Sequence, residues 1–106
     1  MKFEKVTDYV HEDYIQHNPG LPNGLAALAA FVAGFYAEKS PEGAFAIARL
    51  MAYEDIVVAH SLFRLNAADC GSADVDVYRV RDGKLVEYWE VKERVPENLV
   101  SGNPMV

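Results

Sequence analysis

The feature that most constrains the fold is an alternating run of apolar and polar side chains from residue 73 to residue 91, interrupted by turn residues at 81–83. Such alternation is typical of strands that bury one face. If Gly83 takes the left-handed position of a three-residue hairpin loop, Val80 pairs with Lys84. The run therefore predicts two antiparallel strands, and the turn determines which side chains share a face of the sheet.

This register places Asp76 opposite Tyr88 and Asp74 opposite Glu90. Because side chains alternate, one face carries the acids and their neighbours, namely Asp74, Asp76, Tyr78, Val86, Tyr88, Glu90 and Lys92. The other face carries Val75, Val77, Leu85, Trp89 and Val91. Two opposed carboxylates in a shielded site repel each other, so the pKa of one rises toward a value useful in general acid or base catalysis. The alternative is that the apolar face forms the core and the acids face water.

Size and charge narrow the class of protein. The 106 residues suffice for a single domain, residues 1–106, with one modest core. The net charge is −6 and basic residues never cluster, so nucleic acid and anionic membranes are poor partners. No apolar run is long enough to span a membrane and no signal peptide is apparent, which predicts a cytoplasmic protein. Neither a metal site nor a cofactor is predicted, because no metal-binding histidine spacing and no glycine-rich phosphate loop occurs.

An apolar stripe at helical spacing predicts one long helix that begins near Leu25 and includes Phe31 and Phe35. Asn23 is expected to cap its N-terminus, and the Ser-Pro pair at 40–41 to end it. The other expected elements are a short helix at 3–10, a short strand at 14–18, and strands at 44–53, 56–66, 73–81 and 84–95. Helices followed by meandering strands predict an α+β domain, in which a curved sheet wraps the long helix and leaves a conical cavity at one end.

Six blocks of the sequence, taken together, carry a family resemblance. They are Tyr14-Ile15-Gln16-His17-Asn18-Pro19, Asn23-Gly24, Asp55-Ile56-Val57-Val58, Val75-Asp76-Val77-Tyr78-Arg79-Val80, the ten residues 82–91, and Gly102-Asn103-Pro104-Met105. Over nearly the whole chain they resemble the SnoaL-like branch of the nuclear transport factor two-like superfamily. The resemblance implies a cone-shaped, cystatin-like roll, in which a curved mixed or antiparallel sheet encloses a pocket, usually in a dimer. Members commonly begin with a long amphipathic helix, and this chain is expected to begin after it.

The resemblance also implies roles for individual residues. Asp76 matches the acid that ketosteroid isomerases keep protonated, whereas Asn18 falls where those enzymes carry a carboxylate base. An amide cannot accept that proton, which argues against their reaction. Glu90 falls on the late-strand acid of SnoaL cyclases, whose His-Trp-Asp motif reads Tyr88-Trp89-Glu90 here. A phenol at this position only donates or accepts a hydrogen bond near pH 7.

Two histidines are candidates with two readings each. His17 is either a base at the pocket mouth or hydrogen-bonded to a loop carbonyl, and His60 is either a satisfied core histidine or a catalytic one. The predicted catalytic residues are Asp76, Glu90 and His17. The predicted ligand-binding residues are Tyr14, Gln16, Asn18, Phe31, Phe35, His60, Asp74, Tyr78 and Tyr88.

Two functions follow from these expectations. The first is a cofactor-free lyase or isomerase that performs aldol-type or enolisation chemistry on a small carbonyl compound. In it, Glu90 or His17 abstracts a carbon-bound proton while neutral Asp76, helped by Tyr88, holds the enolate oxygen. The second is a non-catalytic dimeric protein that binds a small apolar ligand. In both, the apolar outer face of the sheet is expected to form a homodimer interface through Val75, Val77, Trp89 and Val91.

Overall fold

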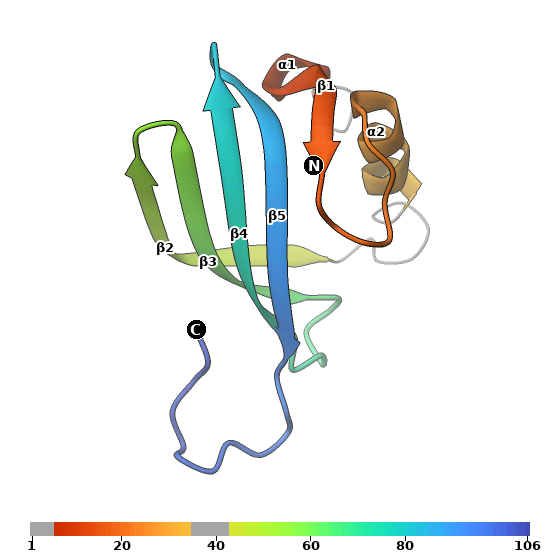
Figure 1. The fold of residues 1–106 in the computed structure, drawn as a ribbon. Helices are drawn as coiled ribbons and strands as arrows, with labels where there is room; N and C mark the ends of the chain where they lie inside the picture. The colour runs from red at the N-terminus through yellow and green to blue at the C-terminus, as the bar shows by residue number, and fades with distance from the viewer. Residues whose placement is uncertain (1–5, 35–42) are drawn as a thin grey trace.

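The computed structural model describes residues 6–34 and 43–106. Its elements are α1 (Val6–Tyr9), β1 (Val10–Gln16), α2 (Leu25–Gly34), β2 (Ala44–Tyr53), β3 (Ile56–Arg64), β4 (Ser72–Arg81) and β5 (Lys84–Arg94). In these residues the strands form one sheet in the order β1-β5-β4-β3-β2 (Figure 1). β1 runs parallel to β5, and the other neighbours pair antiparallel. The predicted α+β class with a curved mixed sheet is confirmed.

The sheet curls so that its two ends approach a common space. Figure 1 shows α1 and α2 beside β1, while the start of β2 crosses behind β4 and β5 toward α2. Phe45 of β2 and Tyr14 of β1 line the same cavity, so both end strands of the sheet contribute to it. No helix within residues 6–34 or 43–106 has the length and apolar character that a membrane crossing requires.

The strand boundaries follow the sequence closely except where loops compete for the backbone. β3 ends at Arg64, two residues before the predicted boundary. The Asp69 carboxylate explains this end, because it accepts the backbone N–H groups of Leu65 at 2.9 Å and of Gly71 at 3.0 Å. β1 begins at Val10 rather than at Tyr14, because both residues are buried and Val10 pairs with β5.

The predicted three-residue loop is wrong. Asp82 and Gly83 form a two-residue turn with φ values of 53° and 77°, as a type I′ hairpin requires, and Arg81 pairs with Lys84. A bulge next to Arg79 then shifts the register once more. Each change moves the pairing by one residue in the same direction, so the total shift is two.

A shift of two residues changes the partners but keeps the faces, because side chains alternate with a period of two. Asp76 therefore pairs with Glu90 rather than with Tyr88, and Asp74 pairs with Lys92 rather than with Glu90. The residues that precede the bulge on β5 change sides, and Leu85 among them lines the cavity.

The acids face inward. Asp74 is 0% exposed and Asp76 is 4% exposed. Their paired residues on β3 are buried as well: Ser61 pairs with Asp74, and Ala59 pairs with Asp76. The alternative in which these acids face water is therefore wrong.

The turn before α2 differs from the expected cap. The Asn23 side chain accepts the backbone N–H of Gln16 at 2.9 Å, so it ties the turn to β1 instead of capping the helix. Gly24, with a positive φ, occupies the position just before Leu25, and its carbonyl accepts the N–H of Leu28. The predicted continuation through Phe35 and the predicted stop at 40–41 lie outside the described residues.

Candidate functional site

The candidate site is a cavity of about 550 Å³ on the inner face of the curled sheet. This volume lies within the range of small-molecule sites. Its apolar wall includes Leu21, Leu28, Phe31, Val32, Phe45 and Phe63. Its polar side includes Tyr14, Gln16, Asn18, Tyr88, Glu90 and Lys92. The polar groups thus come mainly from β1, the loop after it and β5, and the apolar residues of the wall carry no charge.

The centre of the polar side is a phenol between two carboxyl groups. The Tyr88 Oη lies 2.5 Å from Asp76 Oδ1 and 2.7 Å from Glu90 Oε2. A phenol has one hydrogen, so it can donate to only one of the two oxygens. The other short contact requires a proton on a carboxyl group. The cluster therefore holds one proton on Tyr88 and a second proton on either Asp76 or Glu90.

Burial assigns the second proton to Asp76. The pKa of Asp76 lies above its ordinary value of 3.8 because burial disfavours the charged carboxylate. This effect exceeds that of the Tyr88 hydrogen bond, which lowers the pKa, and the Glu90 charge adds to the rise. Glu90 reaches the cavity and accepts the Asn18 amide N–H at 3.3 Å. In this arrangement neutral Asp76 donates to Tyr88, and Tyr88 donates to the Glu90 carboxylate.

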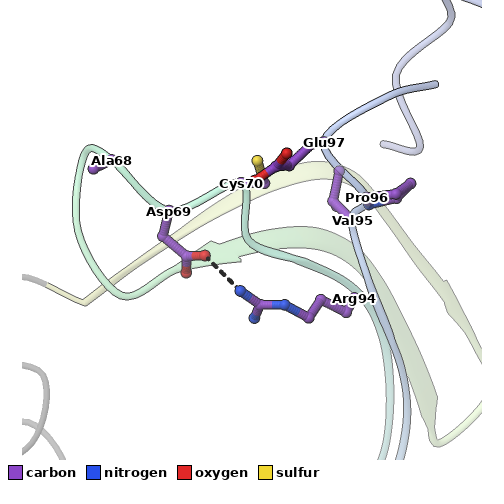
Figure 2. A pocket seen from close by; sticks show the side chains of 7 residues that line it. All are labelled: Ala68, Asp69, Cys70, Arg94, Val95, Pro96 and Glu97. Carbon is purple, nitrogen blue, oxygen red and sulfur yellow. Dashed lines mark ion pairs between the residues drawn. The ribbon is translucent and has the colours of Figure 1, made fainter.

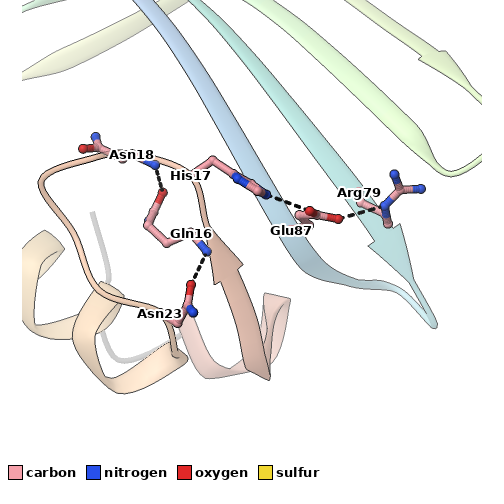
Figure 3. A network of polar contacts seen from close by, with 6 residues as sticks. All are labelled: Gln16, His17, Asn18, Asn23, Arg79 and Glu87. Atoms are coloured by element: carbon pink, nitrogen blue, oxygen red, sulfur yellow. Dashed lines mark hydrogen bonds and ion pairs between the residues drawn. The ribbon is translucent and has the colours of Figure 1, made fainter.

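The polar residues of β1 and the loop after it are fixed by local hydrogen bonds. The Gln16 amide donates to the Tyr14 Oη at 3.4 Å. Its side-chain oxygen accepts the backbone N–H of Asn18 at 3.1 Å (Figure 3). The Asn18 side-chain oxygen accepts the Gly20 N–H at 2.8 Å. These bonds leave the Asn18 amide N–H directed at Glu90, so β1 positions the carboxylate that β5 supplies.

Burial also keeps the cavity tyrosines in their neutral form. The pKa values of Tyr14, Tyr78 and Tyr88 all lie above the ordinary 10.0, with burial as the largest cause. Tyr78 stacks on Tyr88 with ring centroids 5.1 Å apart. Each phenol is therefore a hydrogen-bond donor or acceptor and not a base near neutral pH.

An ion pair between Lys92 and Asp74 lies further along β5. The Lys92 Nζ donates to Asp74 Oδ2 at 3.2 Å and lies 5.5 Å from the centroid of the Phe63 ring. The other Asp74 oxygen, Oδ1, has no hydrogen-bond partner in the described part of the chain. Lys92 was missed by the site prediction, although it alternates with Tyr88 and Glu90 on the inward face of β5, which is the signal that identifies it.

The structure brings most predicted site residues together. Tyr14, Gln16, Asn18, Phe31, Tyr78, Tyr88 and Glu90 line the cavity. Asp76 and Asp74 are not among the lining residues: Asp76 bonds to Tyr88 and Asp74 bonds to Lys92, each contacting a residue that does line it. Phe35 lies outside the described residues.

Both candidate histidines lie on the other face of the sheet. His17 follows Gln16, so its side chain alternates away from the cavity and stacks on Trp89 at 4.8 Å between centroids. Its Nε2 is 2.7 Å from Glu87, which also accepts from Arg79 (Figure 3). The predicted loop-carbonyl bond of His17 is thus replaced by this carboxylate. His60 lies between inward-facing Ala59 and Ser61, and its Nδ1 contacts Arg49 at 3.0 Å.

A second hollow, of about 480 Å³, lies between residues 68–70 and 94–97 (Figure 2). Its ion pair joins Asp69 to Arg94 at 3.5 Å, and the Arg94 side chain is 76% exposed. The Asp69 carboxylate is already engaged by the loop backbone. We therefore place the candidate site in the larger cavity. Within the described residues, no three His, Cys, Asp or Glu side chains are grouped as a metal ion requires.

Comparisons with known proteins agree with this architecture. A family model described as SnoaL-like domain matches residues 1–88. A candidate polyketide cyclase from Bacillus cereus superposes with a TM-score of 0.73 at 27% identity, covering 87% of this chain and 64% of that one. The chain thus spans less than two thirds of that protein's length.

Two further solved structures share the fold. A candidate polyketide cyclase from Acidithiobacillus ferrooxidans has a TM-score of 0.73 at 23% identity, covering 87% of this chain and 76% of that one. A candidate isomerase of the SnoaL-like family from Agrobacterium tumefaciens has a TM-score of 0.72 at 14% identity, covering 86% and 80%. No curated protein sequence matches the chain.

Proposed function

Because the chain belongs to the SnoaL-like family, we propose that it is a small-molecule pocket protein that acts as a cofactor-free lyase or isomerase on a small carbonyl compound. The observation that carries the proposal is the position of Tyr88, between a buried acid and a cavity-lining carboxylate. This arrangement places a proton acceptor and a proton donor side by side at an apolar cavity. Enolisation requires that pair of groups.

In the proposed reaction, the Glu90 carboxylate accepts a proton from the carbon next to the substrate carbonyl. The electron pair of that C–H bond moves into the new C=C bond, and negative charge develops on the carbonyl oxygen. The Tyr88 O–H, backed by the proton of Asp76, turns from Glu90 to this oxygen and stabilises the enolate. Asp76 acts through Tyr88, so it is a positioning residue.

The enolate then has two outcomes, and both return the proton that Glu90 holds. Reprotonation at another carbon gives an isomer. Attack of the enolate carbon on a second carbonyl forms a C–C bond, and the resulting alkoxide takes the proton, as in an aldol addition. Asn18 donates to Glu90 and so keeps the carboxylate oriented during these steps.

The test is deuterium exchange at the acidic carbon of a neutral ketone, for which 2-tetralone in D2O followed by proton NMR is suitable. Glu90→Gln is expected to lower the protein-catalysed rate by about 10²-fold or more, because the amide cannot accept the proton. Tyr88→Phe should lower it by roughly 10²-fold through loss of the oxyanion donor. Glu87→Gln, a matched change on the other face of β5, should leave the rate unchanged.

Equal rates for Glu90→Gln and Glu87→Gln would refute the role of Glu90. Binding of the ketone without any exchange would instead favour the second candidate function, a non-catalytic dimeric ligand-binding protein. The extended apolar wall of the cavity supports that alternative, since it offers contact area without chemistry.

The proposed homodimer uses the outer face of the sheet. A cross-strand row of apolar residues crosses four strands there: Met51, Val58, Val77 and Trp89. Val91 on the same face is 68% exposed. Contact with a second copy would remove this apolar surface from water. Besides the ligand, both proposed functions involve a second copy of the chain as the partner.

A further inference from the structure

The charges around the cavity differ from what a carboxylate-binding pocket needs. Lys92 is the only cation among the described lining residues, and Glu90 is the only anion. Lys92, however, is bound at 3.2 Å by Asp74, whose side chain is fully buried. A buried carboxylate next to an ammonium group cancels most of the field that the ammonium would exert on a ligand.

Counting the inward-facing groups gives the charge that a ligand meets. Lys92 and Asp74 together contribute zero. Asp76 and Tyr88 contribute zero, because the two short contacts of the phenol require a proton on one carboxyl group and Asp76 is the more deeply buried. The Glu90 carboxylate remains, so the inward-facing groups of the described residues carry one net negative charge.

We propose that this cavity selects uncharged carbonyl compounds over carboxylates of the same shape, and that Asp74 is the residue that sets this preference. The inference rests on the proposed function, and it adds the charge class of the ligand. Lys92 keeps further N–H donors beyond the one that Asp74 accepts. Two positions along a strand are about 7 Å apart, so Lys92 can hold a second polar group of a ligand whose acidic carbon lies at Glu90.

The test compares the binding of two nearly isosteric probes, 4-oxo-4-phenylbutanamide and 4-oxo-4-phenylbutanoate, by calorimetry at pH 7. The wild-type protein should bind the amide at least ~10-fold more tightly, because the carboxylate approaches the Glu90 charge without a compensating cation. Asp74→Asn should release the Lys92 charge and lower this ratio by at least about fivefold. Asp82→Asn, which changes the net charge equally in the exposed turn, should leave the ratio unchanged.

Asp74 is buried, so circular dichroism must first establish that Asp74→Asn folds. If it does not, Glu90→Gln provides the second arm: removing the remaining anion should raise the affinity for the carboxylate by roughly 10-fold. Equal affinities of the two probes for the wild-type protein, or an unchanged ratio in the folded variants, would overturn the selectivity. If the wild-type protein exchanges 2-tetralone but binds the two probes equally, this inference alone is overturned. If the wild-type protein binds neither probe, the proposed function is weakened as well.

Discussion

The Tyr88 phenol oxygen contacts two carboxyl groups, and the carboxyl proton that these two contacts require makes the stability of the protein depend on pH. The pKa of Asp76 is raised above 3.8 in the folded state, mainly by burial. The unfolded chain therefore releases this proton first, and the free energy of unfolding should fall as the pH rises from about 3.8 through the folded-state value. In Asp76→Asn this contribution is absent, so the variant should lose less stability over that interval. Urea denaturation at several pH values checks this, and parallel profiles for the two proteins would contradict it.

At the scale of elements, the β4–β5 hairpin depends on the left-handed backbone of Gly83. An added Cβ there would meet no atom within 4 Å, so Gly83→Ala should destabilise through the backbone alone, by about 1 kcal/mol. Gly34→Ala is the matched control, because Gly34 also has open space around it and no positive φ. Chemical denaturation of both variants measures the difference. Equal stabilities would mean that the turn does not need its positive φ.

The same hairpin shows what could and could not be predicted from the sequence. Strict alternation and the Asp-Gly turn predict the two strands and the faces of most of their side chains, although Leu85 lies on the face opposite to the predicted one. Half of the register shift comes from the turn, where the Asp-Gly pair indicates the two-residue type I′ loop that the structure has. The other half comes from the bulge beside Arg79, which the alternation of the strands does not reveal. The chemistry of His17 and His60 favours a place in the site, whereas the alternation of their neighbours puts both on the outer face.

At the scale of the whole molecule, the proposed dimer is tested on Val91, which is exposed on the outer face. A buried charge at the centre of an apolar interface is strongly unfavourable, so Val91→Asp should convert a dimer into a monomer in sedimentation velocity experiments. Val100→Asp introduces the same charge beyond the sheet and should leave the mass unchanged. A monomeric wild-type protein, or a Val91→Asp dimer, would refute this interface.

The most direct measurement of the central claim is a carboxyl-carbon NMR titration of Asp76 and Glu90 in the wild-type protein and in Tyr88→Phe. We expect Asp76 to titrate above the ordinary 3.8, and we expect the signals of the two carboxyl groups to perturb each other through the phenol that contacts both. In Tyr88→Phe this mutual perturbation should weaken while Asp76 stays elevated by burial. Two independent titrations at ordinary values in the wild-type protein would contradict a neutral Asp76 behind Tyr88, and with it the proposed enolisation site.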